Sequence, residues 1–392
     1  MLFKSTEDLM DLGAEITTRE IRQQPEIWKE ALTIFKENRE DIATFLEKVT
    51  ASSADKPVKV IFTGAGTSQY VGDTLVPYLK RTGNRQRFVF ESAGTTDLVS
   101  APYDYLFEEE TVLLVSFARS GNSPESVAAV ALTNQIVPNA YHLTITCAPE
   151  GLLARQAQED GKNLLLLMPP RSNDAGFAMT GSFTCMFLTG LLIFDERETI
   201  ETKENYVSYL SKMGQDILGR EEEIQALVDL DFNRVVYLGS GAMAALTREA
   251  QLKILELTAG KIATMFDSSM GFRHGPKSFV DAKTIVIDFV HNDSYTRQYD
   301  LDLLEEVAGD GIALKTVAIA QKGEVSFSGY TFELLSDMTL PEGYLALAAI
   351  LVAQIFALFT SIKIENTPDT PSATGTVNRV VKGVIIHEYD SN

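Results

Sequence analysis

The chain has 392 residues, enough for roughly two or three domains with a large buried core. Its formal net charge of −20 argues against a nucleic-acid partner, because the phosphates would be repelled. A small anionic ligand in a locally positive site is still permitted. The cysteines, Cys147 and Cys185, lie in apolar surroundings and are expected to be reduced core residues. Since the first residues also lack a signal peptide's basic start and apolar stretch, we expect a cytoplasmic protein.

Residues 1–54 are polar and are expected to form an amino-terminal helical segment. A short connector at residues 52–57 leads into a first α/β unit over residues 55–215. A helix expected over residues 204–228 then leads into a second unit over residues 216–392.

Each unit begins with an apolar strand that runs into a glycine turn, at residues 58–66 and 234–241. Glycine permits the sharp turn and a close ligand approach, and the following helix offers free N–H groups to an anion. The same order of short strands follows in both units, at residues 90–92, 111–116 and 141–146 and at residues 266–268, 284–288 and 314–319. These runs are apolar on both faces, as in buried parallel sheets. The pattern predicts a duplicated, doubly wound α/β fold with ligands at the carboxyl ends of the strands.

The segment at residues 344–364 is long and apolar enough to cross a membrane, with Gln354 and Lys363 as its main polar interruptions. We expect it instead to be the buried central helix of the second unit, and we expect no membrane partner. Residues 367–375 form a turn-rich break, and the closing segment at residues 377–386 fits a helix or a strand equally well.

Two loops of the first unit, at residues 64–68 and 116–126, carry groups that suit a phosphate. Hydroxyls can donate to phosphate oxygens, Gly121 lets backbone amides approach, and Arg119 adds a charge-assisted donor. Because both loops follow strands, the fold brings them to one edge of the sheet. Taken separately, each loop is equally well explained as a Ser/Gly helix cap, since Glu125 follows closely. The candidate phosphate ligands are Gly66, Thr67, Ser68, Arg119, Ser120, Gly121, Asn122 and Ser123.

The second unit has no Thr-Ser pair after its glycine turn, so no phosphate site is expected there. Its polar residues of interest are Glu249, Lys253 and Glu256, whose spacing of four and three places them on one helix face. Taken alone, this spacing favours a solvated helix with an ordinary Glu–Lys pair over an active site. No histidine or carboxylate spacing is typical of a metal site.

The motifs Gly-x-Gly-Thr-Ser at residues 64–68 and Ser-Gly-x-Ser at residues 120–123 resemble those of the SIS (sugar isomerase) family. The resemblance covers nearly the whole chain and implies two tandem SIS domains, each a flavodoxin-like three-layer sandwich. The chain looks similar to the isomerase half of glucosamine-6-phosphate synthase. It is closer still to the AgaS type, the galactosamine-6-phosphate deaminase/isomerases, also called tagatose-6-phosphate ketose/aldose isomerases. Residues 20–25 resemble the segment that precedes the isomerase half of the synthase.

This chain departs from the synthase pattern at two places. Residues 118–123 read Ala-Arg-Ser-Gly-Asn-Ser where the synthase has Ser-Gln-Ser-Gly-Glu-Thr. Residues 178–181 read Ala-Met-Thr-Gly where it has Ala-Ser-Thr-Lys. We therefore expect the sugar to be held differently around C1 and C2, with Met179, Thr180 and Glu249 as candidate substrate-binding residues.

The resemblance also implies roles for four residues. Glu256 matches the carboxylate that moves a proton between C1 and C2, and Lys253 would stabilise the developing negative charge. His274, in a His-Gly-Pro motif, matches a ring-opening histidine that reaches in from the neighbouring subunit, which implies a homodimer with shared active sites. Lys382 matches a lysine that closes over the sugar. This chemistry requires neither a cofactor nor a metal.

Three functions follow from these features. Because the chain starts at Met1-Leu2 without a glutaminase domain, glutamine-driven synthesis is not expected. The leading hypothesis is a deaminase/isomerase that converts galactosamine 6-phosphate to tagatose 6-phosphate and ammonia. The second is a plain ketose/aldose phosphate isomerase, and the third is a non-catalytic phosphosugar sensor. Retention of Glu256, Lys253 and His274 argues against the sensor, whereas no residue shows how the C4 hydroxyl is recognised.

Overall fold

The computed structural model describes residues 1–54, 56–375, 377–379, 381 and 383–390. The chain forms two compact units, which we call the N-unit and the C-unit. The N-unit comprises residues 30–174, 181–200 and 377–392, and the C-unit comprises residues 1–29, 175–180 and 201–376. The units are thus interleaved along the chain, whereas the sequence suggested three consecutive ranges. The reason is that each chain end belongs to the unit whose sheet is more distant in the sequence.

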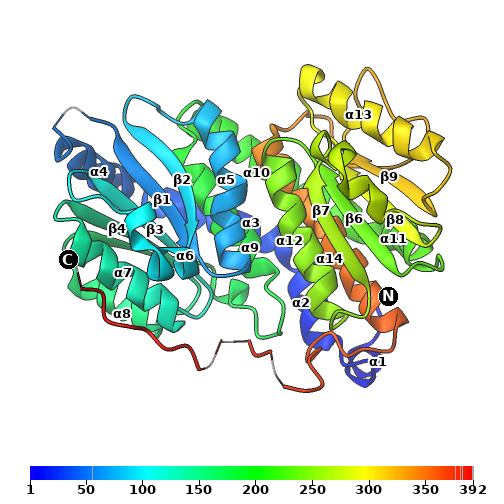
Figure 1. Cartoon of the computed structure of the whole chain (residues 1–392), viewed down its shortest axis with the longest axis horizontal. Coiled ribbons are helices and arrows are strands. Elements are labelled where there is room, and N and C mark those ends of the chain that lie inside the picture. Colours follow the sequence, from blue (N-terminus) through cyan, green and yellow to red (C-terminus); the bar gives the residue numbers. More distant parts are fainter. Residues whose placement is uncertain (55, 376, 380, 382, 391–392) are drawn as a thin grey trace. The chain divides into compact units, whose positions relative to one another are not determined.

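The N-unit contains a five-stranded parallel sheet with the strand order β2-β1-β3-β4-β5 (Figure 1). The central strands β1, β3 and β4 are almost fully buried, as their apolar sequences predicted. The edge strand β5 was not expected from the sequence, and it is only half-buried. The strands are β1 (Val58–Gly64), β2 (Phe88–Gly94), β3 (Val112–Ala118), β4 (Ala140–Thr146) and β5 (Asn163–Leu167).

Helices cover both faces of this sheet, because successive strand residues point to opposite sides. Phe62 of β1 meets Phe194 of α9 on the side of α5 and α9, with ring centroids 5.4 Å apart. The neighbouring Ile61 packs with Leu98 of α6 and residues of α7 and α8 on the other side. The helices are α3 (Gln24–Glu37), α4 (Arg39–Ala51), α5 (Thr67–Thr82), α6 (Thr95–Ser100), α7 (Pro124–Ile136), α8 (Leu152–Glu159) and α9 (Gly181–Phe194).

The C-unit repeats this topology, since its strand order β10-β9-β8-β6-β7 is the same arrangement counted from the other edge. The duplication and the doubly wound fold predicted from the sequence are therefore confirmed. The short edge strand β10 was again missed. The strands are β6 (Arg234–Gly239), β7 (Ala263–Ser268), β8 (Thr284–Phe289), β9 (Lys315–Ala320) and β10 (Tyr330–Glu333).

The helices of the C-unit surround its sheet and include the long helix α14. The helix expected over residues 204–228 is in fact two helices, α10 and α11, separated at Arg220. The guanidinium of Arg220 is held there by Asp216 and Glu223. The helices are α1 (Thr6–Asp11), α2 (Glu15–Arg22), α10 (Ile200–Gly219), α11 (Glu221–Val228), α12 (Ala242–Leu257), α13 (Ser294–Gly309) and α14 (Glu342–Lys363).

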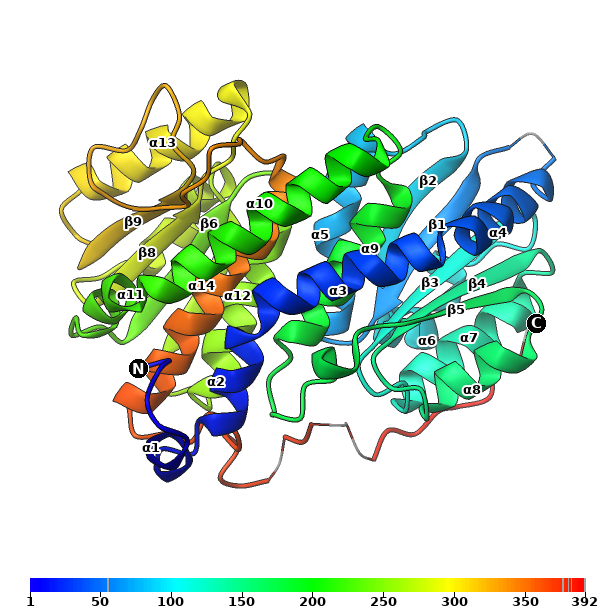
Figure 2. The same cartoon turned by 180° about the vertical axis from the view of Figure 1, so that it is seen from behind.

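Helix α14 passes a length-and-hydropathy test for a membrane span, the only helix in the described ranges to do so. Its most apolar window is 94% buried within the protein. It packs against α12, α11 and α2, and Figure 2 shows α2 beside it. Its buried Gln354 accepts a hydrogen bond from Gln24. Burial on all sides explains why this helix is apolar around its whole circumference.

Candidate active site

The two expected phosphate loops lie at one edge of the N-unit sheet. Strands β1 and β3 are parallel neighbours, with Thr63 opposite Ser116, so the loops that follow them lie close together. This is the position where the strand order reverses, the usual ligand site in such sheets. The structure thus brings the eight candidate phosphate ligands to adjacent loops.

The first loop turns sharply into α5 at Gly66, whose φ of 57° favours glycine. A Cβ at Gly66 would meet nothing within 4 Å, which leaves space for a ligand directly over the turn. Thr67 and Ser68 form the first turn of α5 and are almost fully buried. This turn is the amino-terminal, positive end of the α5 dipole, which favours an anion.

The second loop follows β3 and turns at Gly121, which has a φ of 65°. Ser123 occupies the position before α7, but its side chain makes no capping hydrogen bond. This weakens the helix-cap explanation of the loop. Asn122 has a different structural task, because its Oδ1 accepts the Leu152 N–H at the start of α8 (3.0 Å).

Arg119 of this loop is buried and contacts the carboxyl-terminal segment. Its Nη2 donates to the Arg379 carbonyl at 2.8 Å. The side chain of Arg379 in turn donates to the Asp174 carbonyl through Nε at 3.0 Å. The described residues of the segment from Val377 onward have no regular secondary structure, so neither the helix nor the strand left open by the sequence forms. Arg119 therefore links the phosphate loop to the end of the chain, and its contact with phosphate stays a prediction.

Helix α12 of the C-unit presents Glu249, Lys253 and Glu256 on one face. The Lys253 Nζ lies 3.2 Å from Glu249 Oε1 and 2.7 Å from Glu256 Oε2. The side chains of Lys253 and Glu249 are 0% exposed and that of Glu256 is 22% exposed, so the solvated-helix explanation fails. Only Glu256 of the three is open to a substrate.

The charge of Lys253 is preserved despite its burial. Burial alone would lower the pKa of Lys253, but Glu249 and Glu256 outweigh it, so the pKa is raised above its ordinary value. The ammonium also donates to the Met179 carbonyl at 3.2 Å. Its three protons are thus matched by three acceptors.

Met179 belongs to the Ala175–Thr180 loop, and Asp174, just before this loop, is hydrogen-bonded to the residues just after it. The buried Asp174 carboxylate accepts the N–H groups of Gly181 (3.1 Å) and Ser182 (2.9 Å) at the start of α9. The residues between, Ala175–Thr180, pack with the C-unit. Met179 is half-buried and Thr180 buried, and their contact with substrate stays a prediction.

His274, which was assigned by resemblance, takes no part in these contacts. His274 is exposed at the end of the short helix Gly271–His274, just before Gly275, and makes no hydrogen bond within the described part of the chain. Lys382 lies outside the described residues.

At the corresponding edge of the C-unit sheet, the carboxyls of Asp288 and Asp300 lie at the position equivalent to that of the phosphate loops in the N-unit. Ser269 Oγ lies 2.9 Å from Asp288 Oδ2 and 2.7 Å from Asp300 Oδ1. Ser240, in the glycine turn, also donates to Asp300. Burial, followed by the neighbouring Asp300, raises the pKa of Asp288 well above its ordinary value. The second glycine turn thus lies beside carboxyls, and the absence of a phosphate site here stays a prediction.

Other polar groups fit a structural role. Burial raises the pKa of the Cys147 thiol to about 12, and Cys185 is likewise a buried free thiol, which agrees with inert core cysteines. Among the described residues, no group of three or more His, Cys, Asp or Glu side chains is arranged to hold a metal ion.

Comparison with known proteins agrees with this geometry. The SIS domain matches residues 54–194. The D-galactosamine-6-phosphate deaminase AgaS of Escherichia coli is 44% identical over 387 residues, 96% of each chain. The protein of the same name from Shewanella sp. (strain ANA-3) is 40% identical over 99% of this chain and 96% of its own. The chain belongs to the AgaS family of SIS-domain proteins.

Solved structures extend the agreement to the fold of this AgaS-family chain. The tagatose-6-phosphate ketose/aldose isomerase from Escherichia coli superposes with a TM-score of 0.85, is 40% identical, and covers 95% of this chain and 97% of its own. A structure from Clostridium novyi NT reaches a TM-score of 0.93 at 41% identity over 99% of both chains. Glucosamine-6-phosphate deaminase from Thermotoga maritima, at 22% identity and a TM-score of 0.68, shares the fold.

Several polar residues around the site were missed by the sequence analysis. Asp174 and Asp300 carried no motif, and their partners are contributed by other elements or loops. Glu20 lay in a segment noted only for its resemblance, without a role. A buried carboxylate that caps a distant loop leaves no periodic signal, so only the tertiary structure identifies such residues.

Proposed function

We propose that this protein is a phosphosugar deaminase/isomerase that converts galactosamine 6-phosphate and water to tagatose 6-phosphate and ammonia. The observation that carries the proposal is the buried Lys253 between two carboxylates, of which Glu256 alone reaches solvent. Two AgaS relatives are named galactosamine-6-phosphate deaminases, and the Escherichia coli structure is named for the ketose/aldose isomerisation.

The chemistry follows from a carboxylate beside an ammonium. After the sugar ring opens, Glu256 removes the C2 proton from the 2-amino aldehyde, which gives an enolamine. The Lys253 ammonium, 2.7 Å from Glu256, stabilises the negative charge that develops on the substrate. Glu256 then returns the proton to C1, which leaves a ketimine at C2. Water adds to the ketimine and ammonia leaves, so the overall reaction is an isomerisation followed by a hydrolysis.

The N-unit supplies the phosphate site in this proposal. The 6-phosphate would accept hydrogen bonds from Thr67, Ser68, Ser120 and Ser123 and from the first turn of α5. Since phosphate binding and proton transfer are assigned to different units, substitutions can separate them. Loss of a phosphate ligand should raise KM, whereas loss of the base should lower kcat.

We further propose that the protein acts as a homodimer in the cytoplasm. His274 is exposed and makes no hydrogen bond within the described residues, which suits a ring-opening group that serves the neighbouring subunit. The two buried free thiols suit a reducing compartment.

One assay tests the reaction against its alternatives. The purified protein is given the 6-phosphates of galactosamine, glucosamine, their N-acetyl forms and tagatose, and ammonia and the ketose and aldose phosphates are measured in parallel. Equal release of ammonia and tagatose 6-phosphate from galactosamine 6-phosphate supports the proposal. Interconversion of an unaminated ketose and aldose phosphate without any ammonia release identifies the plain isomerase instead. Tight binding without turnover of any 6-phosphosugar identifies the sensor.

A further inference from the structure

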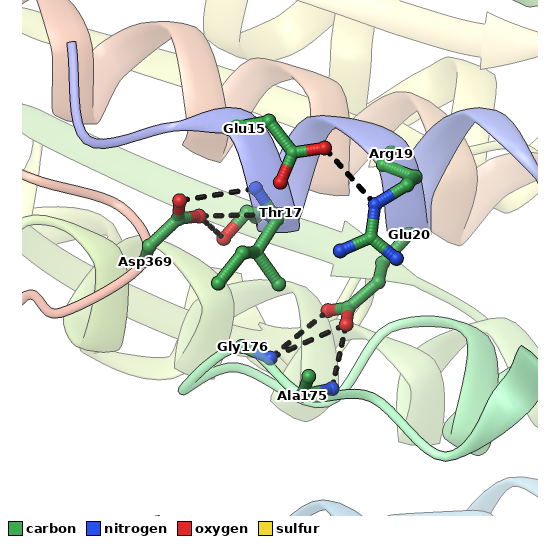
Figure 3. Close-up of polar contacts among 8 residues, drawn as sticks. Glu15, Thr17, Arg19, Glu20, Ala175, Gly176 and Asp369 are labelled. Atoms are coloured by element: carbon green, nitrogen blue, oxygen red, sulfur yellow. Dashed lines mark hydrogen bonds and ion pairs between the residues drawn. The ribbon is translucent and has the colours of Figure 1, made fainter. Parts of the chain in front are cut away.

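Glu20 on α2 holds the Ala175–Thr180 loop by its backbone. Its Oε1 accepts the Ala175 N–H at 2.6 Å and the Gly176 N–H at 3.2 Å, and its Oε2 lies 3.3 Å from the same Gly176 nitrogen (Figure 3). The Glu20 side chain is buried, so these hydrogen bonds to a charged acceptor are shielded from water. The loop is therefore fixed by a carboxylate from a helix far away in the sequence.

The loop backbone has room for this contact only because residue 176 is glycine. A Cβ at Gly176 would lie 2.9 Å from Glu20 Oε2 and 3.4 Å from Thr17 Oγ1. Helix α2 itself is fixed at its start, where Asp369 accepts the N–H groups of Ile16 (3.0 Å) and Thr17 (2.8 Å) (Figure 3). The helix that carries the Glu20 carboxylate is thus held in place by Asp369.

The same loop reaches the active-site lysine. Three residues beyond Gly176, the Met179 carbonyl accepts a hydrogen bond from Lys253 Nζ at 3.2 Å. The other two acceptors of this ammonium are Glu249 and Glu256. Movement of the loop would remove one of three acceptors and let the ammonium reorient relative to Glu256.

We infer that Glu20 is a positioning residue for the reaction: it sets the place of Lys253, and through it of Glu256, by fixing the Ala175–Thr180 loop. This inference rests on the proposed function for its effect on catalysis, although the positioning itself does not require turnover. Glu20 contacts the loop amides, and the loop reaches the ammonium through the Met179 carbonyl, so we expect its effect to pass along this path. A misplacement of about 1 Å at a reacting group costs up to about 10²-fold in rate.

The first test compares Glu20→Ala, Glu20→Gln and Glu15→Gln. Glu20→Ala removes all acceptors and should lower kcat by roughly 10- to 100-fold with little change in KM, because the phosphate loops lie in the other unit. Glu20→Gln keeps one oxygen for the loop amides and should restore most of kcat. Glu15→Gln is the matched control, because Glu15 lies on the same helix and pairs only with Arg19 at a partly exposed site (3.0 Å). The Glu20→Ala variant should also shift the pH profile of kcat, whereas Glu15→Gln should not.

A second pair of variants covers the case in which Glu20→Ala does not fold. Gly176→Ala forces the loop and the Glu20 carboxylate apart while both carboxylate and amides stay present, and it should lower kcat in the same way. Gly161→Ala is its control, since a Cβ there meets nothing within 4 Å. A folded Glu20→Ala or Gly176→Ala protein with kcat within about twofold of wild type would overturn the inference.

A measurement without turnover separates the inference from the proposed function. With ¹⁵N-labelled lysine, the Lys253 ammonium signal is assigned by its loss in Lys253→Arg. We expect this signal to shift in Glu20→Ala and Gly176→Ala and to stay in place in both controls. If wild-type protein has no activity but the signal shifts, the proposed function is wrong and the positioning role stands. An unchanged signal in Glu20→Ala overturns the positioning role, whatever the activity.

Discussion

At the end of β1 the Gly64–Gly66 turn is followed by two hydroxyl residues, Thr67 and Ser68, whereas the equivalent turn after β6 is followed by Ala242 and Met243. The loop after the neighbouring strand β3 carries serines and Arg119, whereas the second turn lies beside the buried carboxyls of Asp288 and Asp300. The strand order is identical in the two sheets. The topology therefore provides a ligand position twice, and the two positions differ in side-chain chemistry, with hydroxyls and a guanidinium at the first and carboxyls at the second.

The largest expected effect concerns the base, which the C-unit carries on α12. Glu256→Gln keeps the shape of the side chain but cannot accept the C2 proton, so kcat should fall by about 10²–10⁴-fold. In heavy water the wild type should place deuterium at C1 of the ketose, and the variant should lose label and turnover together. Glu222→Gln, an exposed carboxylate on α11, is the matched control. Normal turnover by Glu256→Gln would show that the carboxylate belongs only to a structural ion pair.

A second experiment asks whether one chain is sufficient. His274→Ala and Glu256→Gln chains should each be inactive, and mixing them with subunit exchange should restore about a quarter of wild-type activity. Half of randomly formed dimers are mixed, and one of the two sites in each mixed dimer is intact. Light scattering gives the oligomeric state in parallel. A fully active monomer, or a mixture as inactive as its components, would argue against shared sites.

The comparison of the two turns is tested directly by serine substitutions. Ser68→Ala and Ser120→Ala should each weaken binding of a 6-phosphosugar by roughly 1.5–3 kcal/mol, or about 10- to 150-fold, as measured by calorimetry. Ser240→Ala is the control, because it turns Gly239-Ser240-Gly241 into the Gly-Ala-Gly sequence found at residues 64–66. Its affinity for phosphosugar should stay near wild type. If the unphosphorylated sugar binds as tightly as its 6-phosphate, neither turn is a phosphate site.

The smallest effect concerns the carboxyls of the second turn. Ser269 has one hydroxyl proton for two carboxyls, so holding both contacts requires a proton on one carboxyl of the Asp288–Asp300 pair. Burial and Asp300 raise the pKa of Asp288, so its contribution to stability is present below the unfolded pKa and is lost as the pH rises through the folded pKa. Asp288→Asn should therefore reduce the loss of stability with rising pH. Unfolding in urea across the pH range measures this, and an unchanged slope would contradict the shared-proton arrangement.

Much of the fold could be predicted because its signals are local. The β-branched runs marked the central strands, and the glycine turns marked their carboxyl ends. Strands β5 and β10 were missed because they are short, half-exposed edge strands. The division between α10 and α11 at Arg220 was missed because the ion pairs of its guanidinium form only after folding.

The part of the candidate site that depends on local spacing could also be predicted from the sequence. The helical spacing of Glu249, Lys253 and Glu256 placed them on one face, but spacing could not show that Lys253 is buried. The contacts of Arg119 with Arg379 and of Glu20 with Gly176 join residues more than one hundred positions apart. Such pairs cannot be recognised in a single sequence, because Arg119, Arg379 and Glu20 each look like an ordinary surface charge.

The interleaving of the two units has a consequence for synthesis on the ribosome. Residues 1–29 emerge first but belong to the C-unit, where Gln24 pairs with Gln354 on α14, one of the last elements to be made. Arg119 of the N-unit, made early, receives its partner Arg379 only near the end of translation. Neither sheet unit can therefore acquire all its native contacts while the chain is still growing. Early release of the chain before Asp369 would leave α2 without its cap and both units incomplete at once.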